Sequence, residues 1–234
     1  NVTNGSGASH EIKDTEQYIG HVFYIPQPSG VSADMLSAVM IDTAGKQVIT
    51  VPATFVQEGD KIKVTAYRKG NSMYTVVAGQ AGFKDVSATH FASEAIGKLG
   101  ARRIISGYTD STFKPEGTVT RAEAAALLVK ALGLTPVSAD LNFKDVKKEA
   151  WYASAVATVV QNGLFKGYPD ETFRPNQTIT QQEMISIINQ ALVYGGFKSA
   201  TDVTLQQFEA SAGYKAWSKS AVDALIRAGV IKTS

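Results

Sequence analysis

The chain has 234 residues, of which 44% are apolar and none is cysteine, and its formal net charge is +2. This length and apolar content predict one or two globular domains, and the lack of cysteine excludes disulfides, thiol nucleophiles and Cys-ligated metal centres. The weak positive charge does not favour nucleic acid as a partner, and no apolar run reaches the roughly 18 residues of a membrane span, so we expect no membrane insertion.

The N-terminal third of the chain predicts β-structure after a short leader. Residues 1–15 include the Gly-rich run NGSGAS, which is typical of a flexible segment. Residues 16–80 then contain five short runs of β-branched and aromatic residues separated by turn signals: HVFYIP, MLSAVMID, KQVITVPA, KIKVTAYR and SMYTVVAG. We therefore predict a small all-β barrel or sandwich of antiparallel strands.

The stretch EGDKIKVTAYRKGNSMYTV in this β-segment is similar to OB-like barrels, although the pattern is common to many β-domains. A barrel that binds nucleic acid would place stacking aromatic residues among many basic ones. Here such residues are few, so we favour a spacer or structural role, with contact to carbohydrate or protein as the alternative.

The remainder of the chain repeats itself. FKDV at 83–86 returns at 143–146, GYTDSTFKP at 107–115 returns as GYPDETFRP at 167–175, and TVTRAE returns as TITQQE. All three blocks keep one register, and the apolar spacing between them predicts a helix, a loop and a second helix in each unit. The units are 83–134, 143–194 and 201–234, and the third ends before its loop.

These motifs resemble the S-layer homology (SLH) family over residues 83–234. The resemblance implies an all-α domain of three units around a pseudo-threefold axis, so the expected fold class is a small β-domain followed by an all-α SLH repeat domain. It also implies a non-catalytic module, without cofactor, at the bacterial cell surface in the cell wall or S-layer. Its expected ligand is an anionic, pyruvylated secondary cell-wall polysaccharide bound in grooves between repeats.

Arg121 is the first candidate ligand-binding residue. Thr120 and Glu123 have the spacing of a capping box, whereas Arg121 adds positive charge to a helix start that is already positive. An anion that bridges the guanidinium and free helix N–H groups would explain this placement. A surface arginine paired with solvent or a carboxylate is the alternative. The second unit has Gln181 here, which can bind a sugar without supplying charge.

The other candidate ligand-binding residues also recur between units: Trp151, Trp217, Gly107, Gly167, Asp110 and Asp170. The tryptophans open their helices and either stack on a sugar or fill the core. The glycines either adopt a positive φ or leave backbone open to a ligand. The aspartates resemble calcium loops, but these loops have too few oxygen ligands, so an Asx turn is favoured and no metal is expected.

Two other function classes stay open. The first is a structural subunit that self-associates laterally into a surface layer or fibre through β-strand addition. The second, weaker one is an OB-type nucleic-acid binder. An enzyme is not indicated, because the three histidines are scattered and no catalytic motif is present.

Overall fold

The computed structural model describes residues 2–3, 9–10, 15–42, 46–79, 82–138, 142–196 and 215–227. Its contacts divide the chain into two compact units. Unit 1 contains Asn1–Gly117 and Val129–Thr135, and unit 2 contains Thr118–Leu128 and Pro136–Ser234. The two units are described separately below.

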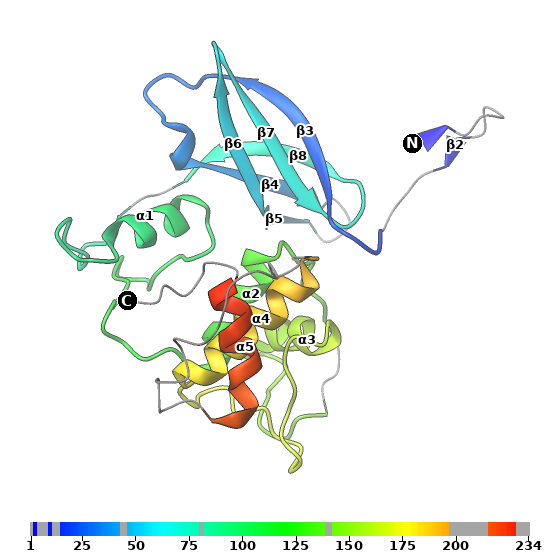
Figure 1. Cartoon of the computed structure of the whole chain (residues 1–234), viewed down its shortest axis with the longest axis vertical. Coiled ribbons are helices and arrows are strands. Elements are labelled where there is room, and N and C mark those ends of the chain that lie inside the picture. The colour runs from blue at the N-terminus through cyan, green and yellow to red at the C-terminus, as the bar shows by residue number, and fades with distance from the viewer. Residues whose placement is uncertain are drawn as a thin grey trace. The chain divides into compact units, whose positions relative to one another are not determined.

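Unit 1 contains two three-stranded antiparallel sheets (Figure 1). One sheet has the order β3-β7-β6, with β3 at Ile19–Pro26, β7 at Lys61–Arg68 and β6 at Ala53–Glu58. The other has the order β5-β4-β8, with β5 at Gln47–Val51, β4 at Leu36–Asp42 and β8 at Met73–Ala78. A 3-10 turn, η1, spans Ala33–Met35, and β1 (Val2–Thr3) pairs with β2 (Ser9–His10).

The core of these sheets follows from side-chain alternation along the strands. In β7, Ile62, Val64 and Ala66 are fully buried, while the intervening residues face outward. They pack with the residues of β4 and β5 that point to the same core: Leu36, Ala38, Met40, Ile49 and Val51. Strand β4 differs because its first five residues are all buried, so both of its faces are covered.

The first repeat contributes helix α1, Ser93–Ala101, to unit 1. Arg102, at the end of α1, donates from Nη1 to the Leu36 carbonyl at 3.0 Å, and Ser37 Oγ donates to the Arg102 carbonyl at 3.1 Å. The Arg102 guanidinium also lies over the Phe55 ring, 4.3 Å from its centroid. These contacts join the first helix of the repeat to strand β4.

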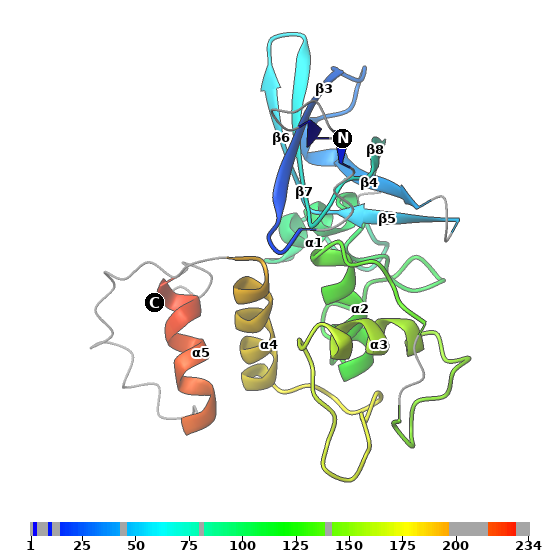
Figure 2. The ribbon, with the colours of Figure 1, turned by 90° about the vertical axis from the view of Figure 1, so that its right-hand side faces the viewer.

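Unit 2 is built from helices and long loops. Its helices are α3 at Ala153–Gln161, α4 at Gln181–Tyr194 and α5 at Ala216–Arg227, together with the first part of α2, Arg121–Ala131. Figure 2 shows α4 and α5 side by side. Their contact is a small apolar core formed by Ile185, Ala221, Val222 and Leu225.

The predicted fold class, a β-domain followed by an all-α pseudo-threefold domain, is wrong. The chain is a mixed α/β protein, and of the predicted barrel or sandwich its N-terminal strands do not form a closed barrel but two three-stranded sheets with a shared core. The repeats are not all-α, because long loops separate their helices and Thr120 pairs with Thr178 in an isolated antiparallel bridge. The predicted strand runs also missed β6, whose Ala53–Glu58 segment follows β5 after one residue.

Most of the predicted third repeat, 201–214 and 228–234, lies outside the described residues, as does most of the predicted leader. Within the described part of the chain, no helix has both the length and the apolar character that crossing a bilayer requires.

Candidate functional site

The aspartate of each FKDV motif holds the loop that precedes the second helix of its repeat. Asp85 accepts hydrogen bonds from the backbone N–H groups of Phe113, at 2.8 Å, and Lys114, at 2.7 Å. These bonds lower the pKa of Asp85, chiefly through Phe113. Asp145 makes the same two bonds in the second repeat. These aspartates had no role among the candidates named from the sequence, although their recurrence within the motif was a signal that could have found them.

The predicted Asx turns are present at Asp110 and Asp170. Asp110 Oδ1 accepts from the backbone N–H of Thr112 at 3.0 Å and from its hydroxyl at 2.6 Å. Asp170 makes the same two bonds with Thr172 and also accepts from Arg174 Nη2 at 3.0 Å. Bonds from Thr172 and then Arg174 lower the pKa of Asp170 to about 2. No group of acidic or histidine side chains in the described residues could hold a metal ion.

The repeated glycines make room for an aromatic ring. A Cβ on Gly107 would collide with the Phe83 ring, and one on Gly167 would collide with the Phe143 ring. Gly107 also has a φ of +64°, a conformation that favours glycine. The glycines therefore let the phenylalanine of the FKDV motif pack against the loop, which gives them a structural role whether or not a ligand also approaches.

Capping boxes begin the second helix of both repeats, as the sequence predicted. In α2, the Thr120 N–H donates to Glu123 Oε2 at 2.8 Å, and the Glu123 N–H donates to Thr120 Oγ1 at 3.2 Å. Thr180 and Glu183 form the same reciprocal pair at α4. These bonds fix where the two helices begin.

The other N–H groups in the first turn of α2 bind the loop of the second repeat. The Arg121 N–H donates to the Gln177 carbonyl and the Ala122 N–H to the Pro175 carbonyl, both at 3.0 Å. The Ile179 N–H in turn donates to the Val119 carbonyl at 2.8 Å. The helix start is thus occupied by backbone carbonyls, so the free N–H groups on which the anion-bridging hypothesis relied are absent from this turn.

The Arg121 side chain is buried against the same loop, with 7% of the residue exposed. Its Nε donates to the Phe173 carbonyl at 2.9 Å and its Nη2 to the Lys166 carbonyl at 3.1 Å. The guanidinium lies 4.9 Å from the Tyr168 ring centroid, 4.8 Å from that of Phe173 and 5.4 Å from that of Phe165. Arg121 therefore connects the second helix of the first repeat to the loop of the second.

Carbonyl dipoles and aromatic faces explain how a positive charge is tolerated at this helix start. The alternative of a solvated surface arginine does not describe this buried side chain. Ligand contact by Arg121 stays a prediction. Nη1 is the guanidinium nitrogen that could donate to a ligand, because it has no hydrogen-bond acceptor within the described residues.

Gln181, the counterpart of Arg121, is exposed at the start of α4. The neighbouring Gln182 makes the contact with the third repeat: its Oε1 accepts from the Lys215 N–H at 3.1 Å and from the Ser218 hydroxyl at 3.2 Å. Ser218 is fully buried at this junction. The two repeats thus use different residues at the start of their second helix to contact the next repeat: Arg121 in the first and Gln182 in the second.

The aromatic residues that open the first helix of each repeat are exposed. Trp151 is 67% exposed and Trp217 is 53% exposed. Phe91, which occupies the equivalent place in the first repeat, is 93% exposed and stacks on His90 with ring centroids 4.7 Å apart. The alternative that the tryptophans fill the core is therefore wrong, whereas sugar stacking stays a prediction. Phe91 was not among the candidate residues named from the sequence.

Comparison with known families identifies the repeats. The family model of the S-layer homology domain matches residues 82–125 and 142–185. These two segments are S-layer homology domains. The matches contain the aspartate-held loops, the capping boxes and Arg121, so the predicted family is confirmed for both repeats.

Relatives share the S-layer homology region. The "Surface-layer 125 kDa protein" of Lysinibacillus sphaericus is 37% identical over 144 residues, which cover 62% of this chain and 12% of that protein. The "Cellulosome-anchoring protein" of Acetivibrio thermocellus is 37% identical over 123 residues, which cover 50% of this chain and 27% of that protein. The "Amylopullulanase" of Thermoanaerobacterium thermosulfurigenes is 24% identical over 226 residues, which cover 87% of this chain and 12% of that protein. The chain thus spans only a minor part of each relative.

Proposed function

We propose that this chain is a non-catalytic module that anchors its protein at the bacterial cell surface by binding cell-wall polysaccharide. The observation that carries this proposal is the pair of S-layer homology domains at 82–125 and 142–185. Relatives that share this region are named as surface-layer and cellulosome-anchoring proteins. The amylopullulanase is an enzyme by name, but this chain spans 12% of it, so we assign its catalysis to other domains.

We further propose that the ligand is anionic and pyruvylated, and that exposed aromatic residues and Arg121 contact it. Trp151 and Trp217 offer ring faces to solvent, as stacking on a sugar requires. Arg121 Nη1 supplies a cation beside the Tyr168 ring, and Arg174 lies over the same ring at 3.8 Å from its centroid. A carboxylate near Tyr168 would therefore meet two guanidinium groups, of which that of Arg174 also pairs with Asp170.

Trp151 gives the cleanest test, because its exposure separates ligand binding from stability. We expect Trp151→Ala to weaken binding to purified cell-wall sacculi by roughly five- to tenfold, since an aromatic contact contributes on the order of 1 kcal/mol. Val193→Ala is the matched control, because Val193 on α4 is 66% exposed and does not open a first helix. Equal binding of both variants and the wild type would contradict a role for Trp151.

Two further measurements separate the finer alternatives. Sacculi from which pyruvate has been chemically removed should bind the wild-type chain more weakly, and unchanged binding would contradict the pyruvylated ligand. Sedimentation of the isolated chain tests lateral assembly, which the name of the Lysinibacillus sphaericus relative favours as the second candidate function. A monomer that binds sacculi supports anchoring, whereas ordered sheets formed without any wall support assembly.

A further inference from the structure

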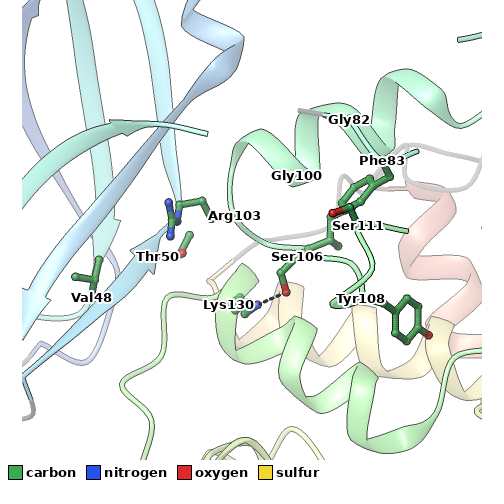
Figure 3. A pocket seen from close by; sticks show the side chains of 11 residues that line it. Val48, Thr50, Gly82, Phe83, Gly100, Arg103, Ser106, Tyr108, Ser111 and Lys130 are labelled. Carbon is green, nitrogen blue, oxygen red and sulfur yellow. Dashed lines mark hydrogen bonds between the residues drawn. The ribbon is translucent and has the colours of Figure 1, made fainter. Parts of the chain in front are cut away.

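Unit 1 contains an open cavity of about 420 Å³ whose lining includes none of the candidate ligand-binding residues predicted from the sequence (Figure 3). Strand β5, the end of α1, the loop of the first repeat and the last turn of α2 all contribute to its lining. The lining includes two cations, three serine or threonine hydroxyl groups and two aromatic rings: Arg103, Lys130, Thr50, Ser106, Ser111, Tyr108 and Phe83. It includes no aspartate or glutamate.

The two cations lack carboxylate partners. Lys130 Nζ donates to Ser106 Oγ at 3.2 Å, the bond drawn in Figure 3, and neither Lys130 nor Arg103 forms an ion pair within the described residues. Burial lowers the pKa of the Lys130 ammonium, and the charge of Arg103 lowers it further. An anion between them would offset both the desolvation and the repulsion.

The backbone at Arg103 gives an independent reason to look for function here. Arg103 has a φ of +59°, in the left-handed region that a residue with a Cβ adopts at a cost. The second repeat places Gly163 at this position, with a φ of +69°. Glycine therefore fits this turn without strain, and the fold alone does not account for an arginine there.

The second repeat serves as an internal comparison. At the positions that correspond to Ser106 and Tyr108, the Arg121 guanidinium donates to the Lys166 carbonyl and lies over the Tyr168 ring. This repeat also has Gly163 in place of Arg103 and Gln190 in place of Lys130. The second repeat therefore lacks the pair of cations formed by Arg103 and Lys130.

We propose that this cavity binds an anionic saccharide, with Arg103 and Lys130 holding its carboxylate or phosphate and Tyr108 contacting the sugar ring. Tyr108 is 43% exposed, and Lys114 Nζ lies over its ring, 4.3 Å from the centroid. The hydroxyl groups of Thr50 and Ser106 lie in the same lining and match the hydrogen-bonding groups of a sugar. Neither Trp151 nor Arg121 lines this cavity, so the proposed site does not depend on them.

Calorimetric titration of the whole chain tests the ligand class with four probes: glucuronate, glucose 6-phosphate, inorganic phosphate and glucose. We expect at least one acidic sugar to bind and glucose not to bind, and the two acidic sugars distinguish a carboxylate from a phosphate. Inorganic phosphate that binds as tightly as glucose 6-phosphate would overturn the saccharide assignment. Absence of binding by both acidic sugars would overturn the site.

Two variants that copy the second repeat locate the binding. We expect Arg103→Gly to weaken affinity by about fivefold, as for an exposed charge pair, and Lys130→Gln to weaken it by about tenfold. The control Lys219→Gln removes an equal charge from the exposed face of α5. Thermal melts should show no loss of stability for Arg103→Gly. Unchanged affinity in both cavity variants, or an equal loss in Lys219→Gln, would overturn the proposal while leaving the wall-binding test at Trp151 intact.

Discussion

A buried arginine at a helix start is the residue whose role changes most between sequence and structure. From the sequence, the charge of Arg121 beside the N-terminus of α2 calls for an anion. In the structure, the carbonyls of Phe173 and Lys166 accept from it instead. Its guanidinium therefore stabilises the contact between the two repeats. A ligand could accept a hydrogen bond only from Nη1, because Nε and Nη2 donate to these carbonyls.

We predict that Arg121→Gln lowers the stability of the chain. The substitution removes two hydrogen bonds and leaves buried carbonyls without their donors, which costs on the order of 2 kcal/mol. The sequence alone would predict level or slightly raised stability, because an unfavourable charge–dipole interaction disappears. Chemical denaturation measures the difference.

Arg174→Gln is the control for this prediction. Arg174 lies in the same loop, but its ion pair with Asp170 is exposed, so its loss should cost well under 1 kcal/mol. If Arg121→Gln were as stable as the wild type, the buried contact between the repeats would contribute nothing to the free energy of unfolding, which would contradict the prediction.

Asp170 should make stability depend on pH under acidic conditions. Its pKa in the folded chain is about 2, below the ordinary value of 3.8, because Thr172 and Arg174 bind the ionised form. The folded state therefore gains stability from Asp170 above 3.8, and that gain is lost as the pH falls from 3.8 through about 2. Asp170→Asn should flatten this part of the profile in melts between these pH values. Glu149→Gln, an exposed control, should leave the profile steep; equal flattening would refute the assignment.

At the scale of elements, a loop held by a carboxylate precedes the second helix of each repeat. Lys114 and Arg174 both have left-handed backbone, with φ of +58° and +59°, and each donates its N–H to the aspartate of its FKDV motif. Short helices supply little cooperative stability of their own. The held loops therefore lead the chain into α2 and α4, whose first residues the capping boxes then fix.

The contact between α4 and α5 depends on a few apolar side chains, which makes it sensitive to truncation. Leu225 on α5 is 1% exposed and packs with Ile185 of α4. We predict that Leu225→Ala costs about 2–3 kcal/mol, because it leaves a cavity in a small core. Circular dichroism during urea unfolding measures this loss. Lys219→Ala, on the exposed face of α5, should change stability by less than about 0.5 kcal/mol. Equal stability of the two variants would show that α5 does not depend on this core.

At the scale of the whole molecule, the first repeat and the β-sheets share unit 1. Arg102 reaches the Leu36 carbonyl and the Phe55 ring, and Tyr18 donates its hydroxyl to the Leu132 carbonyl at 2.6 Å. We therefore propose that the sheets and α1 unfold together. The predicted domain boundary between 16–80 and 83–234 stays a prediction. We do not expect it to separate the parts of the chain that unfold cooperatively.

Hydrogen exchange tests this cooperativity. Arg102→Ala should speed exchange of the β4 amides as well as those of α1, because it removes a partly buried hydrogen bond and a cation–π contact worth about 1–3 kcal/mol together. Lys98→Ala, which breaks only an exposed ion pair with Glu94, should leave β4 unchanged. Faster exchange confined to α1 in the Arg102 variant would mean that the sheets fold independently.

The sequence by itself determined the repeats, the family and the local turns. Motif recurrence identified the S-layer homology domains, and short-range chemistry predicted the capping boxes at Thr120 and Thr180 and the Asx turns at Asp110 and Asp170. These interactions join residues two or three apart, so their geometry is set by the chain itself.

Only the tertiary structure decided what the long-range partners are. Asp85 bonds to backbone 28 residues later, and Arg121 bonds to a carbonyl 52 residues later. The same holds for the two open sheets and for the cavity that brings Arg103 near Lys130. No local pattern encodes such pairs, because folding brings together groups whose separation along the chain carries no signal of their distance in space.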